Sequence, residues 1–332
     1  MKKRRRLKRK VKIIFLIIIL GIFVWLNYLD NFKTIGKVFG EVKYFTSVVN
    51  EKGKELFNQE ELARQKELIK LRALFKEDEN YASESILVYD IKNKDIIFSK
   101  EENKIIVPAS LTKLFVIDYA LTFTNPEDIV NVTKKVLYMP KKNSSSARLT
   151  VGNYTVNDLI KGMLVPSGND ASYALAEYCG NILDSNSLDK QKEFLESLNK
   201  YLLESGYQDT VINDPSGYDL ETKTSSKDLL KLNLKLLNYD WFKDIVSKET
   251  YSIITPDNKK LTWKNTNQFL NEDSEHYNPN VFGIKTGGLK GHYNLVNLTK
   301  IKQKEYLIIT LEAFTEEERT EDNKKIIEKL DY

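Results

Sequence analysis

The chain has 332 residues, of which 41% are apolar, which is enough for one substantial globular core but too little for three domains. Its net charge is +4, yet residues 1–12 alone hold nine Lys or Arg and no acid, so the remainder has 42 basic and 47 acidic side chains and a charge of −5. This distribution argues against a nucleic-acid partner, because a nucleic-acid-binding domain gathers its basic side chains on a folded face. The single cysteine, Cys179, excludes an intrachain disulfide and a cysteine-based metal cluster.

The first predicted element is a membrane anchor. Residues 13–26 are uninterrupted apolar, and the run reaches Leu29 if Asn27 and Tyr28 are interfacial, about the shortest span of a bilayer at roughly 17 residues. A cleaved signal peptide is the alternative, but no small-x-small cleavage site follows, and Trp25 suits a membrane interface. The basic cluster precedes the span, so we expect residues 1–12 in the cytoplasm, a transmembrane anchor at 13–29 and the rest outside the cytoplasm.

Residues 30–80 are rich in Lys, Glu, Phe and Leu, and 59–75 form an amphipathic helical pattern. We interpret this segment as a stalk, or as a first helix packed on the following domain. Coiled-coil pairing is a further alternative, although the apolar positions do not hold a heptad for three repeats.

The remaining residues, 81–332, predict one α/β domain of the α+β type. Residues 85–90 and 95–99 are β-rich runs that flank a turn, as in a hairpin. Residues 111–237 are mainly helical with loops, three strand-like runs follow at 281–285, 292–299 and 305–313, and 316–330 predict a closing helix. We therefore expect an antiparallel sheet of about five strands from both chain ends, with a helical lobe inserted between them.

The first chemical motif pairs Ser110 with Lys113. An extended run ends here and a helical one begins, so Ser110 lies near a helix N-terminus, where free N–H groups favour a developing oxyanion. Lys113 lies one turn on, and a buried, neutral amine there can take the proton of the Ser110 hydroxyl. The spacing alone is a weak signal, because 187–190 and 197–200 share it and are interpreted as solvated helix surface.

The second motif is a tight polar turn that contains Ser167 and Asn169. It can aim one hydroxyl and one amide into a cleft, but an ordinary helix-capping loop has the same composition. The third motif is Lys285 and Thr286 in a predicted strand, where they offer a cation and a hydroxyl to a carboxylate. The glycines that follow would let a substrate backbone lie along the strand, and a bulged surface strand is the alternative.

The three motifs occur in the order Ser-x-x-Lys, Ser-x-Asn, Lys-Thr-Gly, the signature of penicillin-binding proteins and β-lactamases. The chain resembles the low-molecular-mass D-alanyl-D-alanine carboxypeptidase family from about residue 82 to about residue 315. The resemblance extends to the segments 163–171, 214–218 and 226–229. It implies the fold of penicillin-binding proteins and β-lactamases.

For catalysis, the resemblance implies that Ser110 is the acylated nucleophile and that Lys113 is its base. Ser167 is then expected to relay a proton toward the leaving group. The backbone N–H groups of Ser110 and Gly288 are expected to form the oxyanion hole.

For binding, the resemblance implies that Asn169 holds the substrate amide. Lys285 and Thr286 are expected to bind the terminal carboxylate, and Gly287 and Gly288 complete the substrate-binding strand. The segment after them, 288–292, is compact where the family has a longer loop, so we expect a different pocket rim.

The expected substrate is a peptidoglycan stem peptide that ends in D-Ala-D-Ala, trimmed of its last residue through an acyl-enzyme on Ser110, with β-lactams as inhibitors and no cofactor. The chain is expected to be held in the bacterial cell membrane by its N-terminal helix, with the catalytic domain extracytoplasmic, or to be secreted if the signal is cleaved.

Several alternatives share part of this pattern. A serine β-lactamase needs a group that activates water, and the segment at Glu204 lacks the expected Asn partner. A non-catalytic wall-binding homologue keeps the fold but does not acylate, and a purely structural stalk leaves the motifs unexplained. A zinc peptidase or a Ser-His-Asp triad would have to use His276 or His292, which we interpret as ordinary surface histidines.

Overall fold

The computed structural model describes residues 32–77 and 80–332, and the chain divides into two units, 1–69 and 70–332. In the first unit the described residues belong to helix α2 (Phe32–Glu77), whose last turns are part of the second unit. The predicted tail and anchor, 1–29, lie outside the described residues. Among the helices that are described, none is both long enough and apolar enough to cross a membrane.

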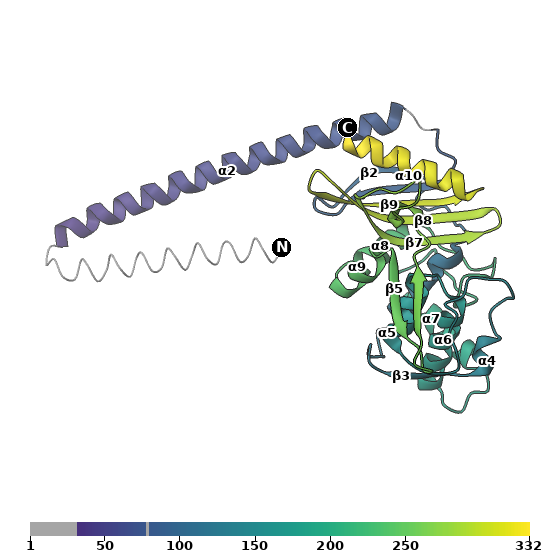
Figure 1. Cartoon of the computed structure of the whole chain (residues 1–332). Coiled ribbons are helices and arrows are strands. Elements are labelled where there is room, and N and C mark those ends of the chain that lie inside the picture. Colours follow the sequence, from purple (N-terminus) through teal and green to yellow (C-terminus); the bar gives the residue numbers. More distant parts are fainter. Residues whose placement is uncertain (1–31, 78–79) are drawn as a thin grey trace. The chain divides into compact units, whose positions relative to one another are not determined.

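The second unit is built on a five-stranded antiparallel sheet with the strand order β2-β1-β9-β8-β7 (Figure 1). Its strands are β1 (Ser85–Asp90), β2 (Asp95–Lys100), β7 (Val281–Leu289), β8 (His292–Ile301) and β9 (Lys304–Ala313). The first hairpin thus pairs through β1 with the last strand, more than 200 residues away. This confirms the predicted sheet with strands from both chain ends.

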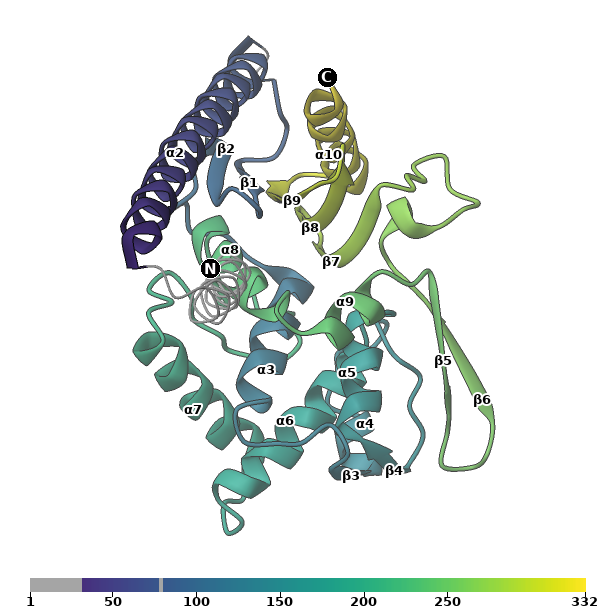
Figure 2. The ribbon, with the colours of Figure 1, turned by 90° about the vertical axis from the view of Figure 1, so that its left-hand side faces the viewer.

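Helices cover both faces of the sheet, and consecutive residues of its central strands β8 and β9 are therefore buried on both sides. On β9, Leu307, Ile309 and Leu311 join the main core together with α8 (Ser226–Leu236). Thr310, with the opposite orientation, accepts a hydrogen bond from Asn323 of α10 at 2.6 Å. Figure 2 shows α10 (Glu316–Asp331) on one side of the sheet and α8 on the other.

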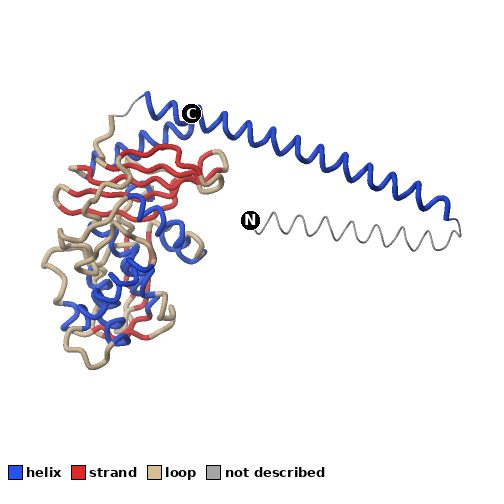
Figure 3. Tube along the Cα trace, turned by 180° about the vertical axis from the view of Figure 1, so that it is seen from behind, coloured by secondary structure: helices blue, strands red, loops and turns tan. Residues whose placement is uncertain are grey.

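The inserted lobe lies between β2 and β7 in the sequence and consists of helices joined by long loops, with two small hairpins (Figure 3). Its helices are α3 (Thr112–Ala120), α4 (Lys134–Leu137), α5 (Val156–Leu164), α6 (Asn169–Leu183), α7 (Lys190–Glu204) and α9 (Asp240–Val246). Two small hairpins, β3 (Ile129–Val132) with β4 (Gly152–Thr155) and β5 (Thr250–Ile254) with β6 (Lys260–Lys264), were not predicted. Strands of four or five residues are too short to establish a period-two pattern.

The C-terminal end of α2 packs on the sheet. Phe75 is fully buried and stacks on Phe98 of β2, with ring centroids 5.2 Å apart. Arg72 donates two hydrogen bonds to the Ile96 carbonyl, which occupies an acceptor on this edge strand. Residues 70–77, the last turns of α2, therefore belong to the second unit.

Candidate active site

A cleft of about 260 Å³ brings together residues from all three predicted motifs. Ser110, Asn169 and Gly288 come from the first, second and third motif, respectively. The other residues that line the cleft are Asn143, Ser144, Ser145, Ser216, Gly217, Tyr218, Leu289 and Lys290. Segments far apart in the sequence thus meet at the junction of the sheet and the helical lobe.

Ser110 lies in a short 3-10 helix, η1 (Ala109–Leu111), which leads directly into α3. Ala109 has a φ of +49°, in the left-handed region that non-glycine residues rarely adopt, so the backbone is strained just before the serine. Ser110 is half-buried, whereas Lys113 is fully buried. The Lys113 Nζ atom lies 2.9 Å from the Ser110 Oγ atom and 2.9 Å from the Ser216 carbonyl oxygen.

The environment of Lys113 favours its neutral amine. Burial lowers the pKa of Lys113 to about 7, and the nearby carboxylates of Asp214 and Asp170 act in the opposite direction. At pH 7 a large fraction of the amine is therefore unprotonated. It is positioned to accept the proton of the Ser110 hydroxyl.

The second motif connects α5 to α6 in a strained turn. Ser167 has a φ of +62° and is buried, and it is not among the residues that line the cleft. Asn169 is 4% exposed, and its Oδ1 atom has no hydrogen-bond partner among the described residues. A buried amide oxygen without a partner is suited to accept an N–H group of a bound molecule.

Asp170, which follows this motif, holds the loop that forms the opposite cleft wall. Its carboxylate accepts hydrogen bonds from the backbone N–H groups of Ala147 at 2.7 Å and Leu149 at 3.0 Å, and from the Ser146 hydroxyl at 2.8 Å. The backbone N–H of Asn169 donates to the Ser145 carbonyl at 2.9 Å. The cleft wall and the second motif are therefore one hydrogen-bonded unit.

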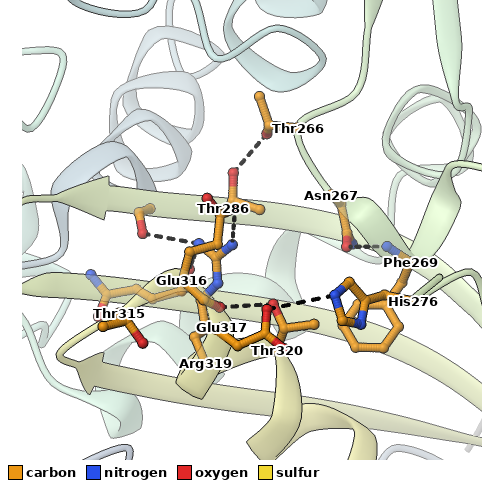
Figure 4. Close-up of polar contacts among 12 residues, drawn as sticks. Thr266, Asn267, Phe269, His276, Thr286, Thr315, Glu316, Glu317, Arg319 and Thr320 are labelled. Carbon is orange, nitrogen blue, oxygen red and sulfur yellow. Dashed lines mark hydrogen bonds and ion pairs between the residues drawn. The ribbon is translucent and has the colours of Figure 1, made fainter. Parts of the chain in front are cut away.

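The third motif lies on β7, an edge strand of the sheet. Lys285 is buried, and its Nζ atom donates to the Thr286 carbonyl at 3.1 Å. Burial lowers the pKa of Lys285 well below its ordinary value, and the nearby cations of Lys113 and Arg319 lower it further. The Thr286 and Thr266 hydroxyls lie 2.6 Å apart (Figure 4). Lys285 and Thr286 stand beside the cleft without being among its lining residues.

Gly287 explains how closely β7 approaches the serine segment, residues 108–112, which carries Ser110. A Cβ atom at this position would lie 2.5 Å from the Pro108 carbonyl oxygen, so only glycine fits without a shift of the backbone. Gly288, the next residue, is exposed and lines the cleft. The third motif therefore packs against the segment that carries Ser110, and its end faces the cleft.

Sequence reasoning gave no role to Arg319, a residue of α10 that reaches the same strand. Arg319 is 3% exposed, and its Nη1 atom donates to the carbonyls of Gly287 at 3.4 Å and Asn294 at 3.3 Å. Its Nη2 atom contacts Glu316 at 2.6 Å, while Nε has no partner among the described residues (Figure 4). An arginine on the apolar side of the closing helix was the only signal available.

A tight turn at residues 214–219 packs against the serine segment from the other side. Gly217 has a φ of +80°, and a Cβ atom there would meet the Ala109 carbonyl oxygen at 1.8 Å and the Thr112 Oγ1 atom at 2.5 Å. The turn thus packs against the Ala109 backbone on one side of Ser110 and against the Thr112 side chain on the other.

We expect Gly217→Ala to destabilise the fold by about 3 kcal/mol or more, because the new methyl group meets backbone as well as adopting a left-handed φ. Gly206→Ala is the matched control, since Gly206 has a φ of +75° but its nearest neighbour is the flexible Lys231 side chain at 3.0 Å. The control should lose only about 1–2 kcal/mol. Chemical denaturation measures both, and equal losses would contradict the steric argument.

The two histidines do not form a catalytic triad with Ser110. His276 is buried against Phe269, so the interpretation as a surface histidine was wrong for it, and its ring lies 3.8 Å from a Glu317 oxygen (Figure 4). His292 pairs with Glu312, and neither histidine lines the cleft. Within residues 32–77 and 80–332, no group of three His, Cys, Asp or Glu side chains is arranged to hold a metal.

Comparisons with known proteins point to one family. The family model for D-alanyl-D-alanine carboxypeptidase matches residues 73–315. D-alanyl-D-alanine carboxypeptidase DacF of Bacillus subtilis is 26% identical over 260 residues, 76% of this chain and 62% of DacF. D-alanyl-D-alanine carboxypeptidase DacD of Escherichia coli is 30% identical over 257 residues, 73% of this chain and 61% of DacD. The chain thus spans about 60% of the length of these relatives.

Solved structures show the same architecture. The Streptomyces K15 DD-transpeptidase superposes with a TM-score of 0.66 at 25% sequence identity, covering 75% of this chain and 97% of that one. Penicillin-binding protein D2 of Listeria monocytogenes, solved in its ampicillin-bound form, superposes with a TM-score of 0.60 at 22% identity, covering 76% of this chain and 98% of that one. The family model covers most of the chain and includes all three motifs, so this chain belongs to the D-alanyl-D-alanine carboxypeptidase family.

Proposed function

We propose that the protein is a serine-type D-Ala-D-Ala carboxypeptidase that removes the terminal D-alanine from peptidoglycan stem peptides. The observation that carries the proposal is the contact of 2.9 Å between Lys113 Nζ and Ser110 Oγ at the wall of the cleft. Because the pKa of Lys113 is lowered to about 7, its amine is available as a base at neutral pH.

In the first chemical step, the Lys113 amine takes the proton of the Ser110 hydroxyl while the oxygen attacks the carbonyl carbon of the penultimate D-alanine. The negative charge that develops on the carbonyl oxygen is received by the backbone N–H groups of Ser110 and Gly288. The C–N bond then breaks, and the proton passes to the leaving amine with Ser167 as the relay, so that free D-alanine departs.

In the second step, a water molecule attacks the ester on Ser110 and gives a proton to the neutral Lys113. The C–O bond breaks, the proton returns to the Ser110 oxygen, and the shortened peptide leaves. Dividing the reaction in this way replaces one high barrier with two lower ones.

The substrate is oriented by polar groups on both sides of the cleft. Asn169 Oδ1, which lacks a partner among the described residues, accepts the N–H of the substrate amide. The terminal carboxylate binds at Lys285 and Thr286 on β7, and Gly287 allows the close approach of that strand. The buried Arg319 guanidinium below β7 adds positive charge to the same region.

β-Lactams are expected to inhibit the enzyme, because they present the carbonyl of a strained amide to Ser110 and a carboxylate to the cleft.

The expected location of the chain follows from its N-terminal sequence. The apolar segment 13–29 anchors the chain in the bacterial cell membrane as a single pass, and the catalytic domain lies outside the cytoplasm, where the peptidoglycan is.

A β-lactamase would turn over rapidly, which requires a group that activates the deacylating water. Glu204, the candidate for this role, ends α7, has a side chain that is two-thirds exposed, pairs with Lys200 at 4.0 Å and does not line the cleft. The geometry therefore favours a long-lived penicilloyl adduct.

The test is to incubate the full-length chain, purified in mild detergent, and its Ser110→Ala variant with a fluorescent penicillin and with a peptide ending in D-Ala-D-Ala. We expect label that depends on Ser110 and decays slowly, together with release of free D-alanine. Rapid decay of the label without D-alanine release would identify a β-lactamase. A folded protein that takes no label would be a non-catalytic homologue.

A further inference from the structure

The 214–219 turn is organised by a single side chain, the carboxylate of Asp214. Its Oδ1 atom accepts hydrogen bonds from the Ser216 N–H at 2.8 Å, the Gly217 N–H at 3.1 Å and the Ser216 hydroxyl. Its Oδ2 atom accepts one from the Asp219 N–H at 2.6 Å. Four donors on one carboxylate fix the backbone of the whole turn.

This turn supplies the second contact of the catalytic amine. Lys113 donates to the Ser216 carbonyl at 2.9 Å, the same distance as to the Ser110 hydroxyl. A neutral amine has one lone pair, which must point at the Ser110 hydroxyl if it is to take the proton. An N–H group held by the Ser216 carbonyl fixes the rotation of the amine and so directs the lone pair.

We propose that Asp214 is a positioning residue for Lys113: it holds the Ser216 carbonyl against the amine and places a fixed negative charge beside it. The inference rests on the proposed function, because it concerns the base of that reaction. Ser216 and Gly217 line the cleft, whereas Asp214 does not.

The charges around Lys113 decide in which direction its pKa should change when Asp214 is replaced. Asp214 precedes α8 and Asp170 lies on α6, and both raise the pKa of Lys113 against the larger effect of burial. Lys285, on β7, faces Lys113 from the sheet, and its own pKa is lowered first by burial and then by Lys113 and Arg319. Tyr173, the titratable group beside Asp214, has its pKa raised to about 12, first by burial and then by Asp214, so it carries no charge in the working range.

Removing the charge of Asp214 should therefore make Lys113 a weaker base that is neutral at lower pH. The test is the rate constant for labelling by a fluorescent penicillin, measured from about pH 5 to about pH 9 on the full-length chain. The wild-type rate should rise with pH, with a midpoint near the Lys113 pKa of about 7. In Asp214→Asn we expect the midpoint to fall by roughly half to one pH unit and the plateau rate to fall about tenfold.

Asp219→Asn is the matched control. It lies in the same turn, but its exposed carboxylate accepts from the Glu221 N–H at 2.7 Å and, among the described residues, it is not one of the charges that act on Lys113. The midpoint and the plateau of its labelling rate should match those of the wild type. Asp214→Glu keeps the charge but has a longer side chain, so it should lower the plateau rate without moving the midpoint.

The outcomes separate this inference from the proposed function. A wild-type chain that takes no label defeats the proposed function, whatever Asp214 does. Labelled wild type with an unmoved midpoint in Asp214→Asn overturns the inference, because the turn would then have a merely structural role. If Asp214→Asn does not fold, a plateau in Asp214→Glu equal to that of the wild type overturns the positioning role.

Discussion

Replacing Lys113 with Met is expected to slow acylation of Ser110 by roughly a thousandfold at neutral pH. The amine lies 2.9 Å from the Ser110 hydroxyl, and a thioether of similar volume cannot accept its proton. Loss of a positioned general base typically reduces the rate by about 10²–10⁴-fold. The wild-type rate should increase as pH rises through about 7, because the neutral form of Lys113 accumulates, and the variant should lose this dependence. Stopped-time labelling with a fluorescent penicillin over a pH series measures both effects.

Lys200→Met provides the control for this experiment. Ser197 and Lys200 repeat the Ser-x-x-Lys spacing, but the Lys200 side chain is 74% exposed and pairs with Glu204 on the surface of α7. Its labelling rate should equal that of the wild type. A Lys113→Met variant that labels within tenfold of the wild type would show that another group serves as the base.

The same Lys113→Met substitution is expected to stabilise the folded protein by about 2 kcal/mol at pH 6. Lys113 is 0% exposed, and its depressed pKa corresponds to a burial cost of at most about 5 kcal/mol when the amine is protonated in both folded and unfolded chains. Methionine fills a similar volume without a charge, while the lost contact to the Ser216 carbonyl offsets part of the gain.

The pH dependence of this gain has a definite sign. Because the folded pKa of Lys113 lies below the unfolded value, the cost is fully present below about pH 7 and disappears as pH approaches about 10.5. The advantage of Lys113→Met over the wild type should therefore shrink between pH 7 and pH 10. Urea denaturation, monitored through the fluorescence of the buried Trp263, measures this difference in the free energy of unfolding, with Lys200→Met as the reference. A gain that is independent of pH would rule out the electrostatic origin.

The local sequence pattern was sufficient to predict the large elements of this protein. The first hairpin, the three C-terminal strands and the closing helix follow from runs of alternating or helical periodicity, which are properties of consecutive residues. The order of the three motifs was also visible, and it led to the family that the comparisons show. Short strands such as β3 and β4 were missed because four residues carry too little pattern.

By itself, then, the sequence determined the sheet and helix periodicity, the family and the residues that could carry the chemistry. The Ser-x-x-Lys spacing alone did not distinguish the pair Ser110 and Lys113 from the pair Ser197 and Lys200, and it was the order of the three motifs that favoured Ser110. Only the tertiary structure buries Lys113 completely and leaves Lys200 in solvent, and burial is what lowers the pKa of an amine. Likewise, contacts of Lys113 with residue 216 and of Arg319 with residue 287 join positions 103 and 32 residues apart. Such distances in sequence leave no local pattern, so only packing could decide which side chains complete the site.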